Sequence, residues 1–126
     1  MEKYVFKSGP IEELSWGKFK IFGEEHYKKY DGTLVGAGKD IRIYKGKVSP
    51  WKERKGHYVT TDMITGVDGC DILIIGCGIN GAITVSEDVK TKFKNVIIKK
   101  TPQACEIFNE YFNQNKNVAL LAHGTC

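Results

Sequence analysis

The strongest hydrophobic pattern lies in the second half of the chain, where three apolar runs alternate with two amphipathic stretches. The runs cover residues 72–75, 96–98 and 118–122 and are rich in Ile, Val and Leu, as is typical of strands buried on both faces. Ser86 followed by Glu87 predicts the start of a short helix. Over residues 71–126 the pattern therefore predicts strand, helix, strand, helix, strand, with right-handed crossovers making the sheet parallel.

The second of these helices has the clearest signature in the chain. Thr101 and Pro102 are typical of a helix start, with Thr as the cap. Apolar residues then recur three and four positions apart, at Ala104, Ile107, Phe108, Tyr111 and Phe112. This spacing predicts a helix over residues 102–115 with one face in the core.

Residues 1–60 have a different pattern, in which apolar and polar positions alternate as in half-buried strands. Lys18, Phe19, Lys20 and Ile21 alternate, and residues 41–45 do so again. Asp31-Gly32 favours a tight hairpin turn, and Pro50 indicates an edge rather than a central strand. This mainly β half must add strands to the sheet or cover one of its faces.

Length and composition limit the architecture and the compartment. The chain has 126 residues, of which 41% are hydrophobic, which predicts a single α/β domain over residues 1–126. No run approaches the roughly 20 apolar residues of a membrane span, and no targeting segment is recognisable, so we expect a cytoplasmic protein. The four cysteines lack paired spacing, which favours reduced thiols.

A glycine loop follows the first buried run and marks the carboxyl end of a central strand, where open α/β sheets bind ligands. Residues 76–81 read Gly-Cys-Gly-Ile-Asn-Gly, which matches the spacing of a dinucleotide fingerprint. However, the β-branched residues 83–85 intervene before a helix can begin, and Lys99-Lys100 stands where that fingerprint needs an acid. The glycines therefore indicate either close backbone packing or an anion-binding loop of another kind.

A basic segment precedes this loop and supplies the second group of candidate residues. Residues 39–58 contain seven Lys or Arg against two acids, a net charge of +5 in a chain whose total is +4. Arg54 and His57, beside Trp51, could bind an anion, or they could form a solvated turn with Trp51 packed beneath it. Tyr44, Trp51 and Tyr58 interleave with the basic residues, which leaves nucleic-acid stacking as a further alternative.

The last four residues, His123-Gly124-Thr125-Cys126, raise the question of a metal site. On an extended strand, residues three apart point to opposite faces, so His123 and Cys126 can meet only if the chain turns at Gly124. We expect neither a metal nor a cofactor. No complete set of acid, base and nucleophile is recognisable, so no catalytic residue is assigned.

Three motifs occur together in this sequence: Trp51-x-x-Arg54-Lys55-Gly56-His57, Ile74-Ile75-Gly76-Cys77-Gly78, and the final His123-Gly124-Thr125-Cys126. With them, the chain resembles the family of Mth-domain proteins, small and mostly uncharacterised, whose human members include an adipogenesis-associated protein and a mitochondrial complex I assembly factor. The resemblance covers nearly the whole chain. It implies a three-layer α/β fold with a mixed central sheet and an accessory β layer, and it suggests a partner-binding, assembly-type role.

From these features we expect a non-catalytic module that binds a protein partner or a small anionic ligand, with a pocket at the glycine loop. The candidate ligand-binding residues are Trp51, Arg54, His57, Gly76, Cys77, Gly78, Asn80 and Gly81. One alternative is a small enzyme acting on an anionic metabolite, in which Arg54, His57 and the loop amides stabilise charge. The other is nucleic-acid binding through residues 39–58.

Overall fold

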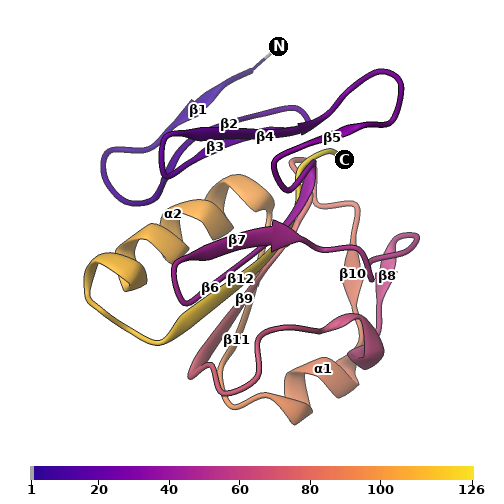
Figure 1. The fold of residues 1–126 in the computed structure, drawn as a ribbon. Coiled ribbons are helices and arrows are strands. Elements are labelled where there is room, and N and C mark those ends of the chain that lie inside the picture. Colours follow the sequence, from indigo (N-terminus) through magenta and orange to yellow (C-terminus); the bar gives the residue numbers. More distant parts are fainter. Residues whose placement is uncertain (1) are drawn as a thin grey trace.

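The computed structural model describes residues 2–126, and a mixed five-stranded sheet runs through its centre (Figure 1). In spatial order its strands are β11 (Val96–Lys99), β9 (Ile72–Cys77), β12 (Val118–His123), β6 (Asp40–Tyr44) and β7 (Lys47–Pro50). The first three are parallel, whereas β6 is antiparallel to β12 and β7 is antiparallel to β6. The three apolar runs of the second half therefore form the parallel part, as predicted, and Pro50 lies on an edge strand.

A second sheet is built from strands within residues 4–35 and covers one side of the molecule (Figure 1). It contains β1 (Tyr4–Val5), β2 (Ile11–Ser15), β3 (Lys18–Ile21), β4 (Glu24–Lys28) and β5 (Leu34–Val35), all antiparallel and in chain order. The Asp31-Gly32 turn joins β4 to β5, as expected. The mixed central sheet with an accessory β layer is confirmed.

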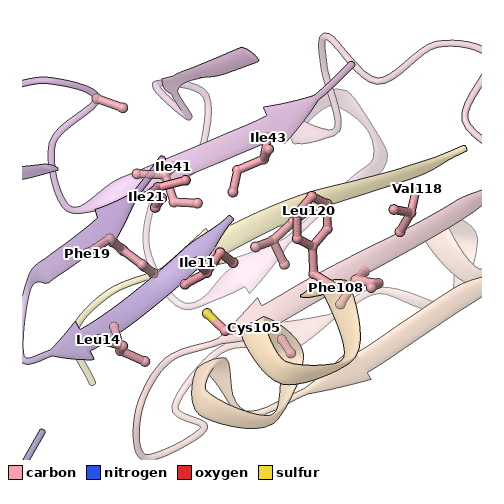
Figure 2. Close-up of a cluster of buried hydrophobic side chains, with 14 residues drawn as sticks. Ile11, Leu14, Phe19, Ile21, Ile41, Ile43, Cys105, Phe108, Val118 and Leu120 are labelled. Carbon is pink, nitrogen blue, oxygen red and sulfur yellow. The ribbon is translucent and has the colours of Figure 1, made fainter. Parts of the chain in front are cut away.

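Helix α2 (Thr101–Asn113) lies between the two sheets and completes the larger core. Figure 2 shows Ile11 and Phe19 of the N-terminal sheet, Phe108 of α2 and Leu120 of β12 pointing into one cluster. Asn109 fastens the layers, because its side-chain amide accepts from the Ile11 amide at 3.0 Å and donates to the Ile11 carbonyl at 2.8 Å. The predicted apolar stripe is thus the contact between α2 and the sheets.

The opposite face of the central sheet is covered by shorter elements. These are the 3-10 helix η1 (Thr61–Met63), helix α1 (Glu87–Lys92), and the two-stranded parallel sheet of β8 (Tyr58–Val59) and β10 (Thr84–Val85). Trp51, Val67, Leu73 and Leu121 belong to the core on this side. Among residues 2–126, the helices are too short or too polar to cross a bilayer.

Both helix starts differ in detail from the capping expected. Ser86 stands at the N-cap of α1, but its hydroxyl makes no capping hydrogen bond. Lys100, not Thr101, is the N-cap residue of α2. The Thr101 hydroxyl instead accepts from the Gly78 amide at 2.9 Å and donates to the His123 carbonyl at 2.6 Å. A buried tertiary partner has replaced the local cap.

Candidate functional site

The candidate site lies where the parallel strands end. β9 ends at Cys77 and β12 ends at His123, and these two residues are register partners. Because β6 is antiparallel to β12, its first residue, Asp40, is paired with His123. Strand polarity therefore brings an aspartate from the start of β6 to the same edge as the glycine loop and the His-Gly-Thr-Cys segment.

An aspartate, a histidine and an arginine form a partly buried network at this edge. Asp40 Oδ1 lies 2.5 Å from His123 Nδ1, and Arg54 donates Nε to Asp40 Oδ1 at 3.1 Å and Nη2 to Oδ2 at 3.3 Å. Desolvation opposes ionisation of Asp40, but the His123 hydrogen bond and the Arg54 charge outweigh it and lower the pKa of this carboxyl. An ionised carboxylate only accepts, so this hydrogen bond requires a proton on His123 Nδ1, and in the neutral imidazole Nε2 is then the acceptor.

The free nitrogen of His123 faces the residues that follow β12. The chain bends at Gly124, whose amide donates to the Lys39 carbonyl at 2.8 Å. As a result, the Thr125 hydroxyl lies 2.9 Å from His123 Nε2 and the Cys126 thiol lies 3.5 Å from it. Cys126 Sγ is also 3.6 Å from His57 Nε2. His123 and Cys126 do meet, because the bend that the sequence left open is present.

The glycine loop and the residue after it hold residues 125 and 126 through main-chain hydrogen bonds. The amide of Ile79 donates to the Thr125 main-chain oxygen at 2.6 Å, and those of Asn80 and Ala82 donate to the Cys126 main-chain oxygen at 3.2 and 3.0 Å. Gly78 has a φ of +99°, and a Cβ there would clash with the backbone of Cys126. The sequence suggested these amides as donors to a bound anion. In the structure, the amides of residues 79, 80 and 82 donate to residues 125 and 126.

The other loop residues also have structural surroundings. A Cβ at Gly76 would lie 2.9 Å from Thr101 Oγ1 and 3.2 Å from Ala122 Cβ, so this glycine permits close packing of α2 and β12. Gly81 closes a turn onto the Gly78 carbonyl. Burial raises the pKa of the Cys77 thiol to about 11, which keeps that thiol neutral. The binding role assigned to residues 76–81 stays a prediction.

The basic segment splits between two environments. Trp51 is only 2% exposed and donates its indole N–H to the Met63 carbonyl at 2.8 Å. A buried indole offers no face to a nucleobase, so the stacking alternative loses one of its three aromatic residues. Arg54 is tied to Asp40, whereas His57 is exposed beside Cys126. The structure thus links His57 to the glycine loop through Cys126.

A small pocket of about 160 Å³ adjoins Asp40 and Arg54. Its basic lining residues are Lys28, Lys39, Lys52 and Arg54, and its apolar ones are Leu34, Ala37, Pro50 and Trp51. We call it the lysine pocket. Larger hollows exist, above all one at the edge strand β11 lined by Lys90, Lys94 and Tyr111. No residue of the Asp40 network lines that hollow. The lysine pocket is therefore the better candidate for a ligand, although it is smaller.

Sequence reasoning missed Asp40 and left His123 and Cys126 without a role. Asp40 and His123 are 83 residues apart, and no spacing rule connects them. The two residues are brought together by the antiparallel pairing of β6 with β12. That pairing can be seen only in the folded structure. Within residues 2–126, no group of three or more His, Cys, Asp or Glu side chains is arranged to hold a metal ion.

Comparison with known proteins gives a family and a fold. A family model described as "Protein of unknown function (DUF498/DUF598)" matches residues 11–123. The conserved hypothetical protein PH1505 from Pyrococcus horikoshii OT3 superposes with a TM-score of 0.72 at 25% identity, over 92% of this chain and 98% of that one. None of the curated proteins matches the chain.

Two further solved structures share the fold at lower identity. The protein MT938 has a TM-score of 0.71 at 19% identity, over 94% of this chain and all (100%) of that one. A protein described as an outer membrane protein from Bartonella henselae has a TM-score of 0.69 at 16% identity, over 98% of this chain and 100% of its own. At these identities the likeness concerns the fold alone.

Proposed function

The chain belongs to the DUF498/DUF598 family of proteins of unknown function, and on that premise we propose that it binds a small organic anion in the lysine pocket. The observation that carries the proposal is the charge of the lining. Four basic side chains surround the pocket and Asp40 is the one carboxylate among its lining residues. Asp40 is already paired with Arg54, so the charge of the three lysines is uncompensated there.

The surroundings of the three lysines favour an anion over a neutral ligand. Across residues 2–126, none of Lys28, Lys39 and Lys52 is within ion-pair distance of a carboxylate. Charge-assisted hydrogen bonds from ammonium groups to carboxylate or phosphate oxygens are about twice as strong as neutral ones. The pocket therefore supplies donors for one anionic head group.

The size and the apolar wall of the pocket limit the rest of the ligand. Drug-sized ligands occupy roughly 300–1,000 Å³, so about 160 Å³ fits a head group with only a short tail. Leu34 is 45% exposed and offers an apolar surface to that tail, whereas Ala37, at 4% exposure, adds little. A short-chain carboxylate or a small phosphate ester has this chemistry.

The glycine loop has a structural part in this proposal, because it holds the residues that contact His123. Its amides hold residues 125 and 126, these residues contact His123, and His123 is bonded to Asp40 at the pocket. The ligand is thus proposed to lie on the basic-segment side of Asp40, where Trp51 and Arg54 line the wall, and the loop keeps the strand end in place.

Calorimetric titration with inorganic phosphate and with the straight-chain carboxylates from acetate to hexanoate tests the proposal. Lys52→Glu should weaken binding about tenfold or more, because a hydrogen bond to a charged group contributes about 1.5–3 kcal/mol. Lys55→Glu is the matched control, since it makes the same charge change three residues away on an exposed side chain outside the pocket.

The carboxylate series tests the apolar wall. Each added methylene that contacts Leu34 should tighten binding by up to about fourfold, at about 0.8 kcal/mol per buried CH₂. Amide NMR shifts should be largest around Ala37 and Lys39. Equal weakening by Lys52→Glu and Lys55→Glu, or no binding of any probe at millimolar concentration, would refute anion binding at this pocket.

A further inference from the structure

The cluster at the end of β12 has the parts of a thiol nucleophile with its base. The Cys126 thiol is 3.5 Å from His123 Nε2, and His123 Nδ1 is 2.5 Å from Asp40 Oδ1. A nucleophile beside a base that a third group orients is the arrangement of nucleophilic catalysis, wherever the residues stand in the sequence. We propose that Cys126 is the nucleophile of an acyl-transfer reaction, with His123 as its general base.

The orientation of His123 is fixed by its surroundings. The ring is 3% exposed, and the Asp40 carboxylate holds the proton on Nδ1, so the lone pair of Nε2 faces Thr125 and Cys126. Arg54 in turn binds both oxygens of Asp40, which keeps the carboxylate from rotating away. Asp40 and Arg54 therefore act as positioning residues, since their hydrogen bonds orient the His123 ring.

Two groups compete for Nε2, and their chemistry distinguishes them. The Thr125 hydroxyl is closer, at 2.9 Å, but an alcohol is a far weaker acid and nucleophile than a thiol. Cys126 alone also contacts a second imidazole, His57, at 3.6 Å. Cys126 is half-buried and His57 is exposed, so a small substrate can approach the sulfur beside His57.

The reaction needs no oxidant and no cofactor. His123 Nε2 takes the thiol proton, and Cys126 Sγ forms a bond to the carbonyl carbon of an ester or thioester. His57 donates a hydrogen bond to the oxyanion that develops. The bond from the carbonyl carbon to the leaving alcohol or thiol then breaks, and the leaving group takes the proton from His123. Water, deprotonated by His123, then adds to the acyl carbon; the C–S bond breaks, the acid leaves, and the Cys126 sulfur takes the proton back from His123.

This activity goes beyond anion binding and does not depend on it, because a neutral ester can test it. With p-nitrophenyl acetate, we expect a burst of p-nitrophenolate and one acetyl group on Cys126, located by mass spectrometry of peptides. Cys70 is an internal reference, since it is also a half-buried thiol but lacks a histidine partner among residues 2–126. Burial and the charge of Asp71 also raise the pKa of the Cys70 thiol, so the histidine variants are needed to assign the difference to His123 and His57. Cys126 should be acetylated about 100-fold faster than Cys70.

Variants separate chemistry from folding. His123→Gln should slow acetylation of Cys126 about 100-fold or more, and His57→Gln, at an exposed position, should slow it about tenfold without affecting stability. Cys70→Ala should leave the rate at Cys126 unchanged. In urea, Cys70 and Cys126 should react at similar rates in the wild type and in the two histidine variants, which shows that the folded structure sets the difference.

Asp40→Asn tests positioning. An asparagine amide favours the other tautomer, with the proton on Nε2, so the rate should fall and its pH profile should lose the limb near neutral pH that an imidazole base produces. A purely structural role would lower the rate without changing the profile. Equal acetylation of Cys126 and Cys70 in the folded protein, acetyl on Thr125, or an unchanged rate in His57→Gln and His123→Gln would overturn the proposal.

Discussion

Thr101→Val tests the link that joins the glycine loop, helix α2 and the end of β12. The Thr101 side chain is fully buried, at 0% exposure. Its hydroxyl accepts from the Gly78 amide at 2.9 Å and donates to the His123 carbonyl at 2.6 Å. Valine has nearly the same shape but neither function, so the substitution removes both hydrogen bonds and leaves no large cavity.

The loss of stability in Thr101→Val comes from the Gly78 amide and the His123 carbonyl, which stay buried without their partner. A buried donor or acceptor that loses its partner costs about 1–3 kcal/mol. Burial of the new methyl group returns part of this, so we expect a loss of about 2–3 kcal/mol. For a chain of this size, that loss lowers Tm by about 6–12 °C. In urea, where m is about 2 kcal/mol/M, the midpoint should fall by about 1–1.5 M.

Two control variants isolate the hydroxyl. Thr101→Ser keeps both hydrogen bonds and loses one methyl group, so it should cost only about 1 kcal/mol. Thr91→Val makes the same change on exposed helix α1, where the hydroxyl bonds to the Asp88 carbonyl, and it should stay within about 0.5 kcal/mol of the wild type. The reasoning is refuted if Thr101→Val is as stable as the wild type, or more stable than Thr101→Ser.

Two further predictions concern pH. Desolvation lowers the pKa of His26 from its usual 6.5, and the charge of Glu24 partly offsets this. As pH falls, His26 therefore gains its proton in the unfolded chain before it does so in the folded one. The urea midpoint should accordingly fall as pH drops below about 6.5. His26→Gln should flatten this slope between pH 8 and 5, and identical slopes would contradict the argument. The lowered pKa of Asp40 stabilises the fold above its usual 3.8, and that stability should be lost as pH falls through the lowered value. Asp40→Asn should show a shallower acid slope between pH 5 and 2.5, whereas an equally steep loss would assign acid unfolding to other carboxylates.

The parallel half of the fold could be predicted because its signals are local. A continuous apolar run can be satisfied only by burial on both faces, and the strands at residues 72–75, 96–98 and 118–122 were placed within two residues of their observed ends. The stripe of α2 likewise needs only its own spacing. In the N-terminal half, alternation indicated strands at residues 18–21 and 41–45, but nothing in it fixed the order of the strands or the sheet that each joins.

The candidate site could be predicted only in part, for the opposite reason. The motifs around His57, the glycine loop and Cys126 were each visible, but their contacts depend on the polarity and register of strands far apart in sequence. The same register brings Asp40 to His123. For Trp51 the sequence left open a stacking surface or a side chain packed beneath the basic turn, and its indole lies in the core.

By itself, then, the sequence determined the three buried strands and the two helices of the second half, since hydrophobic spacing acts over a few residues. Only the tertiary structure decided what the polar groups do. In the glycine loop and just after it, the amides of Ile79, Asn80 and Ala82 donate to the main-chain oxygens of residues 125 and 126. Asp40 of β6 contacts the His123 ring because antiparallel pairing with β12 places the two residues side by side. A hydrogen bond forms only between groups that are close in space, and these groups come close only once the sheet has formed.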